Sequence, residues 1–207
     1  MQIVINGTAC ECETGETILT IARRNGIFIP TMCHHDKYPG EGACRLCVVE
    51  ITENGRSKVV ASCIYPVTHE ITVETDTEKL QRYRRLLIAF MQRRAPNSEA
   101  IAKLMEEYEV PDYSLRSLLT GKCILCGLCV RACKKIGISA ISMVKRGTGK
   151  KVSTPYDEPS PVCIGCGACA RVCPTGAILV TETEDSRIIW GREFPKKRHA
   201  AAGKKEE

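Results

Sequence analysis

The sequence predicts an α+β protein in which short strands come first, helices follow, and cysteine-rich segments come last. Three observations lead to this prediction. Residues 1–76 contain strand-length apolar segments punctuated by Asn-Gly pairs, the strongest short signal for a tight hairpin turn. Apolar residues in 77–119 recur at the spacing of a helix. Residues 120–184 contain two near-identical runs of four cysteines, and a short extension, 185–207, follows them.

The segment 1–76 is expected to form a small domain of strands around one helix. Asn6-Gly7 separates the first two strands, and Asn54-Gly55 separates a later pair. The helix is expected to end near Gly26, since glycine often follows the last helical turn. The expected elements are strands at 2–5, 8–12, 47–51, 57–61 and 71–73 and a helix at 17–25.

Four cysteines of this segment form a candidate metal site. They are spaced as Cys33-x10-Cys44-x2-Cys47-x15-Cys63. A [2Fe-2S] cluster takes four thiolates, most of them usually on one loop. The interval before Cys44 is longer than in the plant-type C-x4-C-x2-C loop, so the spacing departs from that pattern.

The neighbouring thiols and imidazoles are expected to play other roles. Cys10 and Cys12 fall on one face of a strand, where a lone pair of thiols is expected to pack or lie at the surface rather than bind metal. His34 and His35 adjoin Cys33 and raise the alternative of a Rieske centre, which needs two histidines on one iron. Adjacent residues on an extended loop point apart, and four cysteines already suffice. Hydrogen bonding near the cluster is therefore the preferred role for these histidines.

The segment 77–119 is expected to be a helical connector. In its first helix Leu80, Tyr83, Leu87 and Phe90 recur at helical spacing, which predicts an apolar face, and Pro96 ends the helix. A second helix, capped by Asn97 or Ser98, is predicted from an apolar stripe at i, i+3, i+4 and i+7. That stripe consists of Ile101, Leu104, Met105 and Tyr108.

Basic side chains take the remaining positions of the first connector helix. Two interpretations are open: a solvated face, which is the commoner use of such a run, or a docking surface for an acidic partner subunit. The side chains are Lys79, Arg82, Arg84, Arg85, Arg93 and Arg94.

Each cysteine run in 120–184 reads C-x2-C-x2-C-x3-C, and Pro174 follows the second. This is the run of bacterial two-cluster ferredoxins, in which the fourth cysteine of each run binds the other cluster. Gly127, Gly165 and Gly167 leave room for backbone amides to approach cluster sulfurs. We therefore predict two [4Fe-4S] clusters, the first held by Cys123, Cys126, Cys129 and Cys173 and the second by Cys133, Cys163, Cys166 and Cys169.

Zinc is the main alternative for these runs, because paired C-x2-C is also the spacing of zinc ribbons. A zinc site takes four ligands, and two overlapping triplets with a terminal proline fit that count poorly. Disulfides are disfavoured too. No signal peptide or membrane span is evident, so a cytoplasmic protein is expected, and thiols stay reduced in that compartment.

The segment between the two cysteine runs is expected to cover one side of the [4Fe-4S] cluster pair. Strands at 138–144 and 150–154 should form a hairpin around Gly147 and Gly149, and 177–181 resembles a closing strand. In the C-terminal extension, Ile188 to Trp190 can add a further strand. Pro195 onward has the composition of a solvated tail.

The formal net charge of +6 raises the question of nucleic-acid binding. An oxidised cluster with four thiolates carries about −2, so three of them bring the loaded protein to about zero. The basic excess is therefore better explained as compensation for cluster charge.

Thr31-Met-Cys33-His-His, Gly42-Ala-Cys44-Arg-Leu-Cys47 and the two four-cysteine runs resemble the N-terminal iron-sulfur region of the large complex I subunit. They are equally similar to the diaphorase iron-sulfur subunit of NAD-reducing hydrogenases and to the N-terminal part of [FeFe] hydrogenases. The resemblance covers about residues 1–181. It implies a β-grasp [2Fe-2S] domain followed by a two-cluster ferredoxin domain. It also implies that the binuclear ligands are Cys33, Cys44, Cys47 and Cys63.

The chain departs from several of these relatives in the connector. They carry a His-x3-Cys-x2-Cys-x5-Cys run there, which holds an additional [4Fe-4S] cluster. No cysteine lies between Cys63 and Cys123 in this sequence, so that cluster is expected to be missing. The departure favours a shortened, modular relative over a complex I subunit.

Function is expected to be electron transfer. The sequence has no G-x-G-x-x-G fingerprint for NAD or flavin and no evident nucleophile and base pair. The leading hypothesis is a subunit with one [2Fe-2S] and two [4Fe-4S] clusters in a cytoplasmic NAD(P)H-dependent oxidoreductase complex. By resemblance, its partners are a flavin- and NAD(P)-binding subunit and a catalytic subunit such as a hydrogenase, a formate dehydrogenase or an electron-bifurcating transhydrogenase module. The alternatives are a free polyferredoxin and a zinc-binding nucleic-acid protein.

Overall fold

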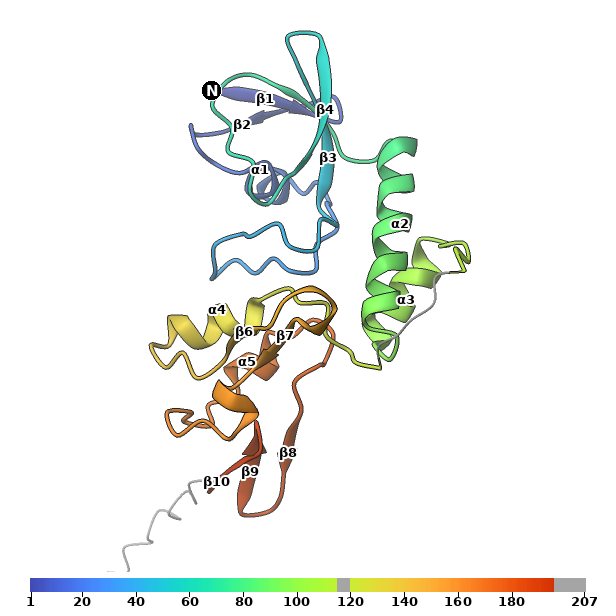
Figure 1. Ribbon diagram of the computed structural model, residues 1–207. Helices are drawn as coiled ribbons and strands as arrows, with labels where there is room; N and C mark the ends of the chain where they lie inside the picture. Colours follow the sequence, from blue (N-terminus) through green and yellow to red (C-terminus); the bar gives the residue numbers. More distant parts are fainter. Residues whose placement is uncertain (115–119, 196–207) are drawn as a thin grey trace, which may run out of the picture. The chain divides into compact units, whose positions relative to one another are not determined.

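The computed structural model describes residues 1–114 and 120–195 (Figure 1). The chain divides into two compact units. The first comprises residues 1–128 together with 174–177, and the second comprises 129–173 together with the chain from residue 178 onward. No helix in the described ranges is both long and apolar enough to cross a bilayer.

The first unit contains a five-stranded mixed sheet in the order β2-β1-β5-β3-β4. β1 and β5 run parallel, and every other neighbouring pair is antiparallel. Figure 1 shows helix α1 lying against this sheet, which confirms the expected β-grasp arrangement. The elements are β1 (Gln2–Ile5), β2 (Thr8–Glu11), α1 (Ile18–Arg24), β3 (Val48–Glu53), β4 (Arg56–Ala61) and β5 (Thr72–Glu74).

Both predicted Asn-Gly turns are present. Asn6 and Gly7 have φ of 49° and 78°, and Asn54 and Gly55 have φ of 48° and 73°. Paired positive φ values define a type I′ turn, whose twist matches that of the flanking strands. Each turn therefore sets the register of its hairpin, pairing Ile5 with Thr8 and Glu53 with Arg56.

Aliphatic side chains of α1 and of alternate strand positions form the core of this sheet. Thr17 caps α1 through its hydroxyl oxygen, which accepts from the backbone N–H of Thr20 at 3.3 Å. The helix ends at Arg24, and Asn25 closes it by donating from Nδ2 to the carbonyl of Ile21 at 2.8 Å. The largest fully buried side chains of this core are Ile3, Ile5, Ile18, Leu19, Ile21, Val49 and Ile51.

Two connector helices follow, α2 (Glu78–Arg94) and α3 (Glu99–Glu107), and the predicted apolar face of α2 is only partly correct: Leu80 is buried, but two other members of that face are exposed. Tyr83 and Phe90 are 46% and 51% exposed, whereas Arg84 is 2% exposed. Leu80 and Ile88 each lie about one helical turn from Arg84, on either side of it, and form the buried face with Ala89 and Met91. The buried face of α2 differs from the predicted one because Arg84 donates hydrogen bonds inside the unit, to the carbonyls of Val48 and Thr75.

The end of α2 and the start of α3 fall near the predicted points. α2 ends just before Ala95 and Pro96. Ser98 occupies the N-cap position of α3 but makes no capping hydrogen bond, and the neighbouring Asn97 instead donates from Nδ2 to the carbonyl of Thr120 at 2.6 Å. Ile101 is the buried anchor of α3.

The second unit contains two short sheets and two short helices that carry cysteines. The hairpin of β6 and β7 is shorter than predicted, and the strand expected at 177–181 lies at 180–182. That strand pairs with the added strand near Ile188, giving the order β10-β9-β8. The tail predicted from Pro195 onward lies almost wholly outside the described residues. The elements are α4 (Leu128–Lys135), β6 (Ser142–Val144), η1 (Gly147–Gly149), β7 (Lys151–Ser153), η2 (Pro155–Asp157), α5 (Ala168–Arg171), β8 (Val180–Glu182), β9 (Ser186–Ile189) and β10 (Arg192–Pro195).

Candidate metal centres

The four cysteines expected to bind the [2Fe-2S] cluster all lie in the first unit and are all buried. Cys47 immediately precedes β3, and Cys63 comes two residues after the end of β4. Because these strands pair Val48 with Ala61, both cysteines emerge at the same end of the sheet. Ser62 fixes this end, since its hydroxyl and its backbone N–H donate to the carbonyl of Cys47 at 2.8 and 3.1 Å.

Cys33 and Cys44 come from the loop that precedes β3, and their sulfurs accept backbone hydrogen bonds. The amide of Cys44 donates to Sγ of Cys33 at 3.3 Å. Further loop amides hydrogen-bond sulfurs: Ala43 to Cys33, and Leu46 to Cys44. Such N–H groups stabilise negative charge on sulfur, which is the state in which cysteine binds iron.

The four thiols interact as two pairs, and each pair contains one acidic member. A hydrogen bond from Cys33 lowers the pKa of Cys44 to about 6, and one from Cys63 lowers the pKa of Cys47 to about 7. The same bonds, with burial, raise the pKa values of Cys33 and Cys63. At neutral pH one sulfur of each pair is therefore close to the thiolate form that a metal centre needs.

Two glycines let the loop close over these sulfurs. A Cβ on Gly40 would lie 2.4 Å from the carbonyl oxygen of Cys63, and one on Gly42 would lie 2.8 Å from Cδ1 of Ile64. Gly42 also has φ of 59°, a conformation that side chains disfavour. Four buried thiols, amides directed at them and a loop that leaves no room for a Cβ together fit a [2Fe-2S] cluster.

A buried arginine supports the same site from α2. Nη2 of Arg84 donates to the carbonyls of Val48 at 2.9 Å and Thr75 at 2.6 Å, and Nη1 lies 3.4 Å from Oδ1 of Asp76. Burial lowers the pKa of Arg84, and negative charge at Cys47 is among the effects that oppose the fall. A guanidinium stays protonated in proteins, so a permanent positive charge lies near a candidate ligand.

The two remaining cysteines of the first unit's sheet, Cys10 and Cys12, and the histidines His34 and His35 have contacts within residues 1–76. Cys10 and Cys12 are buried in the hydrophobic core of the sheet, as the packing interpretation expects. Nε2 of His34 lies 3.2 Å from Oδ1 of Asp36. Nδ1 of His35 accepts from the backbone N–H of Lys37 at 3.2 Å.

In the second unit, all four cysteines expected to bind the second [4Fe-4S] cluster line one cavity. Cys133 lies on α4 and Cys169 on α5, while Cys163 and Cys166 come from the loop before α5. The amide of Ala140 donates to Sγ of Cys133 at 3.3 Å. The rest of the lining is mostly apolar and includes Ile136, Ile138, Ala140, Ile141, Ile189 and Trp190.

The hairpin of β9 and β10 holds the loop that carries these cysteines. Nη1 of Arg192 lies 3.0, 2.6 and 3.0 Å from the carbonyl oxygens of Ser160, Pro161 and Cys163. A Cβ on Gly165, which has φ of 67°, would lie 2.4 Å from the ring of Phe194. The extension that follows the last cysteine therefore forms part of the second site.

Sequence reasoning placed an added strand here but did not connect it with the metal centre. Burial raises the pKa of the Cys169 thiol, and the neighbouring indole N–H of Trp190 opposes that rise. Trp190 was a detectable signal, because it is the only tryptophan of the chain and stands beside a glycine between two strand-length segments.

The cysteines expected to bind the first [4Fe-4S] cluster belong to both units. Cys123 and Cys126 fall in the first unit, and Cys129 and Cys173 fall in the second. The amide of Leu125 donates to Sγ of Cys123 at 3.4 Å. Within the described ranges, no group of three or more His, Cys, Asp or Glu side chains converges to hold a single metal ion.

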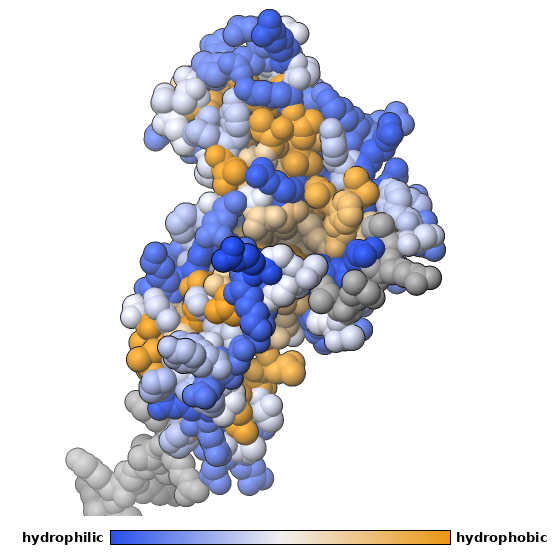
Figure 2. All heavy atoms as spheres, in the orientation of Figure 1, coloured by the Kyte–Doolittle hydropathy of each residue, from blue (hydrophilic) through white to orange (hydrophobic). Residues whose placement is uncertain are grey.

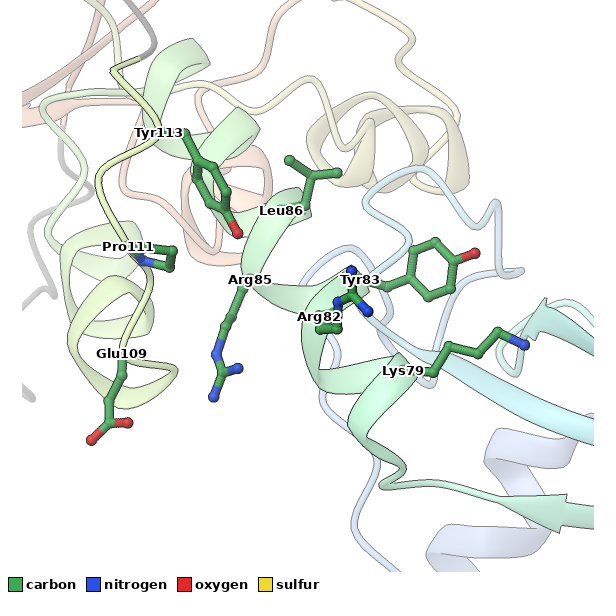
Figure 3. A pocket seen from close by; sticks show the side chains of 8 residues that line it. All are labelled: Lys79, Arg82, Tyr83, Arg85, Leu86, Glu109, Pro111 and Tyr113. Atoms are coloured by element: carbon green, nitrogen blue, oxygen red, sulfur yellow. The ribbon is translucent and has the colours of Figure 1, made fainter.

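A groove of about 780 Å³ lies beside α2 in the first unit (Figure 3). Lys79 pairs with Glu50 at 2.7 Å, and Nε of Arg85 donates to the carbonyl of Tyr108 at 2.9 Å. Both interpretations of the basic run thus remain open, although Arg84 belongs to neither.

Figure 2 shows hydrophobic side chains reaching the surface among hydrophilic ones. The groove is lined by Lys79, Arg82, Tyr83, Arg85, Leu86, Glu109, Pro111 and Tyr113.

Family models match both cysteine-containing segments. Residues 1–78 match the 2Fe-2S iron-sulfur cluster binding domain, and residues 122–177 match the 4Fe-4S dicluster domain. The chain joins a [2Fe-2S] domain to a [4Fe-4S] dicluster domain. The [2Fe-2S] domain contains the four buried cysteines Cys33, Cys44, Cys47 and Cys63, and the dicluster domain contains both four-cysteine runs.

Three relatives match the chain across both domains. The chain is 30% identical over 204 residues to the NADPH-Fe(3+) oxidoreductase subunit alpha of Geobacter sulfurreducens, covering 86% of this chain and 24% of the relative. It shares 27% identity over 214 residues with the NADP-reducing hydrogenase subunit HndD of Solidesulfovibrio fructosivorans, covering 88% and 36%. With the mitochondrial NADH dehydrogenase [ubiquinone] iron-sulfur protein 1 of Solanum tuberosum it shares 25% identity over 204 residues, covering 86% and 27%.

The chain spans about a quarter to a third of the length of these relatives. A solved structure is more similar in extent: a chain of an NAD⁺-reducing [NiFe]-hydrogenase in the H2-reduced state matches with a TM-score of 0.74 and 27% identity, covering 85% of both chains. The predicted fold class and the predicted resemblance to complex I and hydrogenase iron-sulfur subunits are therefore confirmed.

Proposed function

We propose that this chain is the electron-transfer subunit of an NAD(P)H-dependent oxidoreductase complex. It relays single electrons between a flavin- and NAD(P)-binding subunit and a catalytic subunit such as a hydrogenase, a formate dehydrogenase or an electron-bifurcating transhydrogenase module. The observation that carries the proposal is the joining of the two domains in a chain that matches the hydrogenase chain over 85% of each. A cytoplasmic complex keeps the cysteines reduced and ready for iron.

Three clusters are proposed, with twelve cysteines as ligands. A bound cluster supplies a centre that takes up and releases one electron without bond chemistry in the protein. The [2Fe-2S] ligands are Cys33, Cys44, Cys47 and Cys63. The first [4Fe-4S] ligands are Cys123, Cys126, Cys129 and Cys173, and the second are Cys133, Cys163, Cys166 and Cys169.

The residues around the clusters set how readily each accepts an electron. Backbone amides that donate to ligand sulfurs, such as Cys44 to Cys33 and Ala140 to Cys133, stabilise the added negative charge. Arg84 contributes in the same direction through its charge. Burial of the [2Fe-2S] ligands keeps water away and strengthens each of these interactions.

Iron and acid-labile sulfide analysis, with electron paramagnetic resonance (EPR) of the reduced chain, tests the cofactor assignment. We expect about ten iron atoms per chain, from one binuclear and two tetranuclear clusters. Cys44→Ala should remove the [2Fe-2S] signal and leave the [4Fe-4S] signals. Cys10→Ala, which alters a buried thiol outside the proposed ligand sets, is the matched control and should leave the iron content unchanged. Two zinc ions per chain without sulfide would contradict the assignment.

Purification from the native cell tests the subunit role against the alternative of a free polyferredoxin. The proposal expects a flavoprotein to copurify with the chain. Free ferredoxins that steer toward basic docking sites are usually acidic, whereas this chain carries a formal charge of +6 before cluster binding. A monomer with no attached flavoprotein would support the polyferredoxin alternative.

A further inference from the structure

The turn between β9 and β10 places a bulky residue in an unfavourable backbone conformation. Trp190 and Gly191 have φ of 54° and 73°, and they join the paired residues Ile189 and Arg192. This two-residue type I′ turn prefers Asn-Gly, as in both turns of the first unit. A tryptophan at positive φ is strained, so its presence here calls for a compensating role of the side chain.

The side chain faces the second cysteine site. Trp190 lines the same cavity as Cys133, Cys163, Cys166 and Cys169. Its Nε1 is buried and has no hydrogen-bond partner in the part of the chain that the structure describes. A buried indole N–H normally finds an acceptor, because leaving it unsatisfied is unfavourable. The sulfur of Cys169 can accept a hydrogen bond, and Cys169 lines the same cavity and belongs to the apolar cluster against which Trp190 packs.

The hairpin that carries Trp190 is anchored where this contact requires it. Arg192 contacts three carbonyls of the cysteine loop, and Nη1 of Arg187 lies 3.3 Å from the carbonyl oxygen of Gly165. Ile189, next to Trp190, is 1% exposed in the apolar cluster that includes Cys169. The indole is therefore held over the site by contacts on both strands.

We propose that Trp190 is a positioning residue for the second [4Fe-4S] cluster, its indole N–H donating a hydrogen bond to the ligand sulfur of Cys169. This rests on the proposed function, which places a cluster at these four cysteines. A hydrogen bond to a ligand sulfur favours the reduced, more negative cluster and so raises its reduction potential. The rest of the indole covers the cavity and limits access of water.

Two substitutions separate this role from a merely structural one. Trp190→Phe keeps an aromatic ring but removes the donor. Trp190→Asn creates the preferred Asn-Gly turn, so it should fold at least as well as the original chain while losing both donor and cover. Both substitutions should lower one [4Fe-4S] midpoint potential by up to about 59 mV, which corresponds to a change of about tenfold in the one-electron equilibrium constant. The [2Fe-2S] midpoint should not move, and Ile188→Val serves as the hairpin control.

A second measurement needs no substitution. Because the chain has one tryptophan, ¹⁵N-indole labelling marks a single nitrogen. Pulsed EPR of the reduced, labelled chain should show a weak coupling from this nitrogen to a [4Fe-4S] signal. Intact [4Fe-4S] signals with no such coupling, or with unchanged potentials in both variants, would overturn the role of Trp190 alone. A wild-type chain with no [4Fe-4S] signals would overturn the proposed function itself.

Discussion

Arg84 on α2 donates from Nη2 to the carbonyl of Val48, 2.9 Å away and one residue beyond Cys47. The same nitrogen donates to the carbonyl of Thr75, so one side chain joins the connector helix to β3 and to the end of β5. The guanidinium is 2% exposed and carries its charge into the interior beside a proposed cluster ligand. The connector is therefore a structural part of the proposed [2Fe-2S] site.

Arg84→Met should destabilise the first unit and make the [2Fe-2S] cluster harder to reduce. The substitution leaves the carbonyls of Val48 and Thr75 without their donor, at a cost of about 3 kcal/mol in unfolding free energy. It also removes a positive charge that favours the reduced cluster. Thermal unfolding and EPR-monitored redox titration measure the two effects. Arg84→Lys keeps the charge but not the planar fork, so its potential should move less than that of Arg84→Met, and equal shifts would contradict the electrostatic explanation.

Gly40→Ala should prevent assembly of the [2Fe-2S] cluster while sparing the other two. The new Cβ would lie 2.4 Å from the carbonyl oxygen of Cys63, a backbone atom that cannot move without displacing a proposed ligand. Iron content should fall by about two atoms per chain, with loss of the [2Fe-2S] signal. Gly149→Ala is the matched control, since its Cβ would meet nothing closer than 3.9 Å. A full iron content in Gly40→Ala would show that the loop tolerates the displacement.

Arg192→Met should accelerate iron loss from the second [4Fe-4S] site. Three carbonyls of the cysteine loop share the two N–H groups of Nη1 and would lose this charged donor, and a hydrogen bond to a charged group contributes about 1.5–3 kcal/mol. The rate of iron transfer to a chelator measures the effect, with the EPR signals showing which cluster is lost. Arg171→Met removes an exposed arginine of α5 and is the charge-matched control. Equal rates in the two variants would mean that the hairpin does not retain the cluster.

Ser62→Ala should lower the free energy of unfolding of the first unit by about 1 kcal/mol, the usual contribution of one buried hydrogen bond. Ser62 is fully buried, and its hydroxyl holds the carbonyl of Cys47 at 2.8 Å. Denaturant unfolding of the loaded chain measures the loss. Ser57→Ala removes a hydroxyl from an exposed position on β4, where it pairs with Thr52, and should change stability less. A reversed order would contradict the importance of the Cys47 end.

The sequence predicted the parts of the molecule that depend on local chemistry. Asn6-Gly7 and Asn54-Gly55 specify their turns because few other pairs reach positive φ twice in succession. The two [4Fe-4S] ligand sets are predictions from cysteine spacing, because a run such as Cys163 to Cys173 is characteristic of one kind of centre. The [2Fe-2S] set is a prediction from the resemblance. The four cysteines proposed for the second [4Fe-4S] cluster line one cavity.

The buried face of α2 could not be read from periodicity. Apolar spacing counts Arg84 as a solvated residue and Tyr83 as a buried one, and the structure reverses both. Arg84 is buried because its acceptors lie 36 and 9 residues away in sequence, on β3 and just after β5, which only the folded sheet brings together. A helical pattern carries no information about such partners.

The role of the C-terminal hairpin was missed for a related reason. Trp190-Gly191 is not a preferred turn pair, so the turn left no ordinary signal. The contacts that tie the hairpin to the cysteine loop, from Arg192 and Phe194, join residues about 30 apart and depend on the tertiary fold.

Every cysteine precedes residue 174, whereas the hairpin that covers the second site begins at Ser186. During synthesis all the cysteines therefore emerge from the ribosome before the hairpin that packs against four of them. A chain truncated after Glu182 would keep every proposed ligand and lose the hairpin that packs against four of them, so exposure of this candidate site depends on how much of the chain has been synthesised.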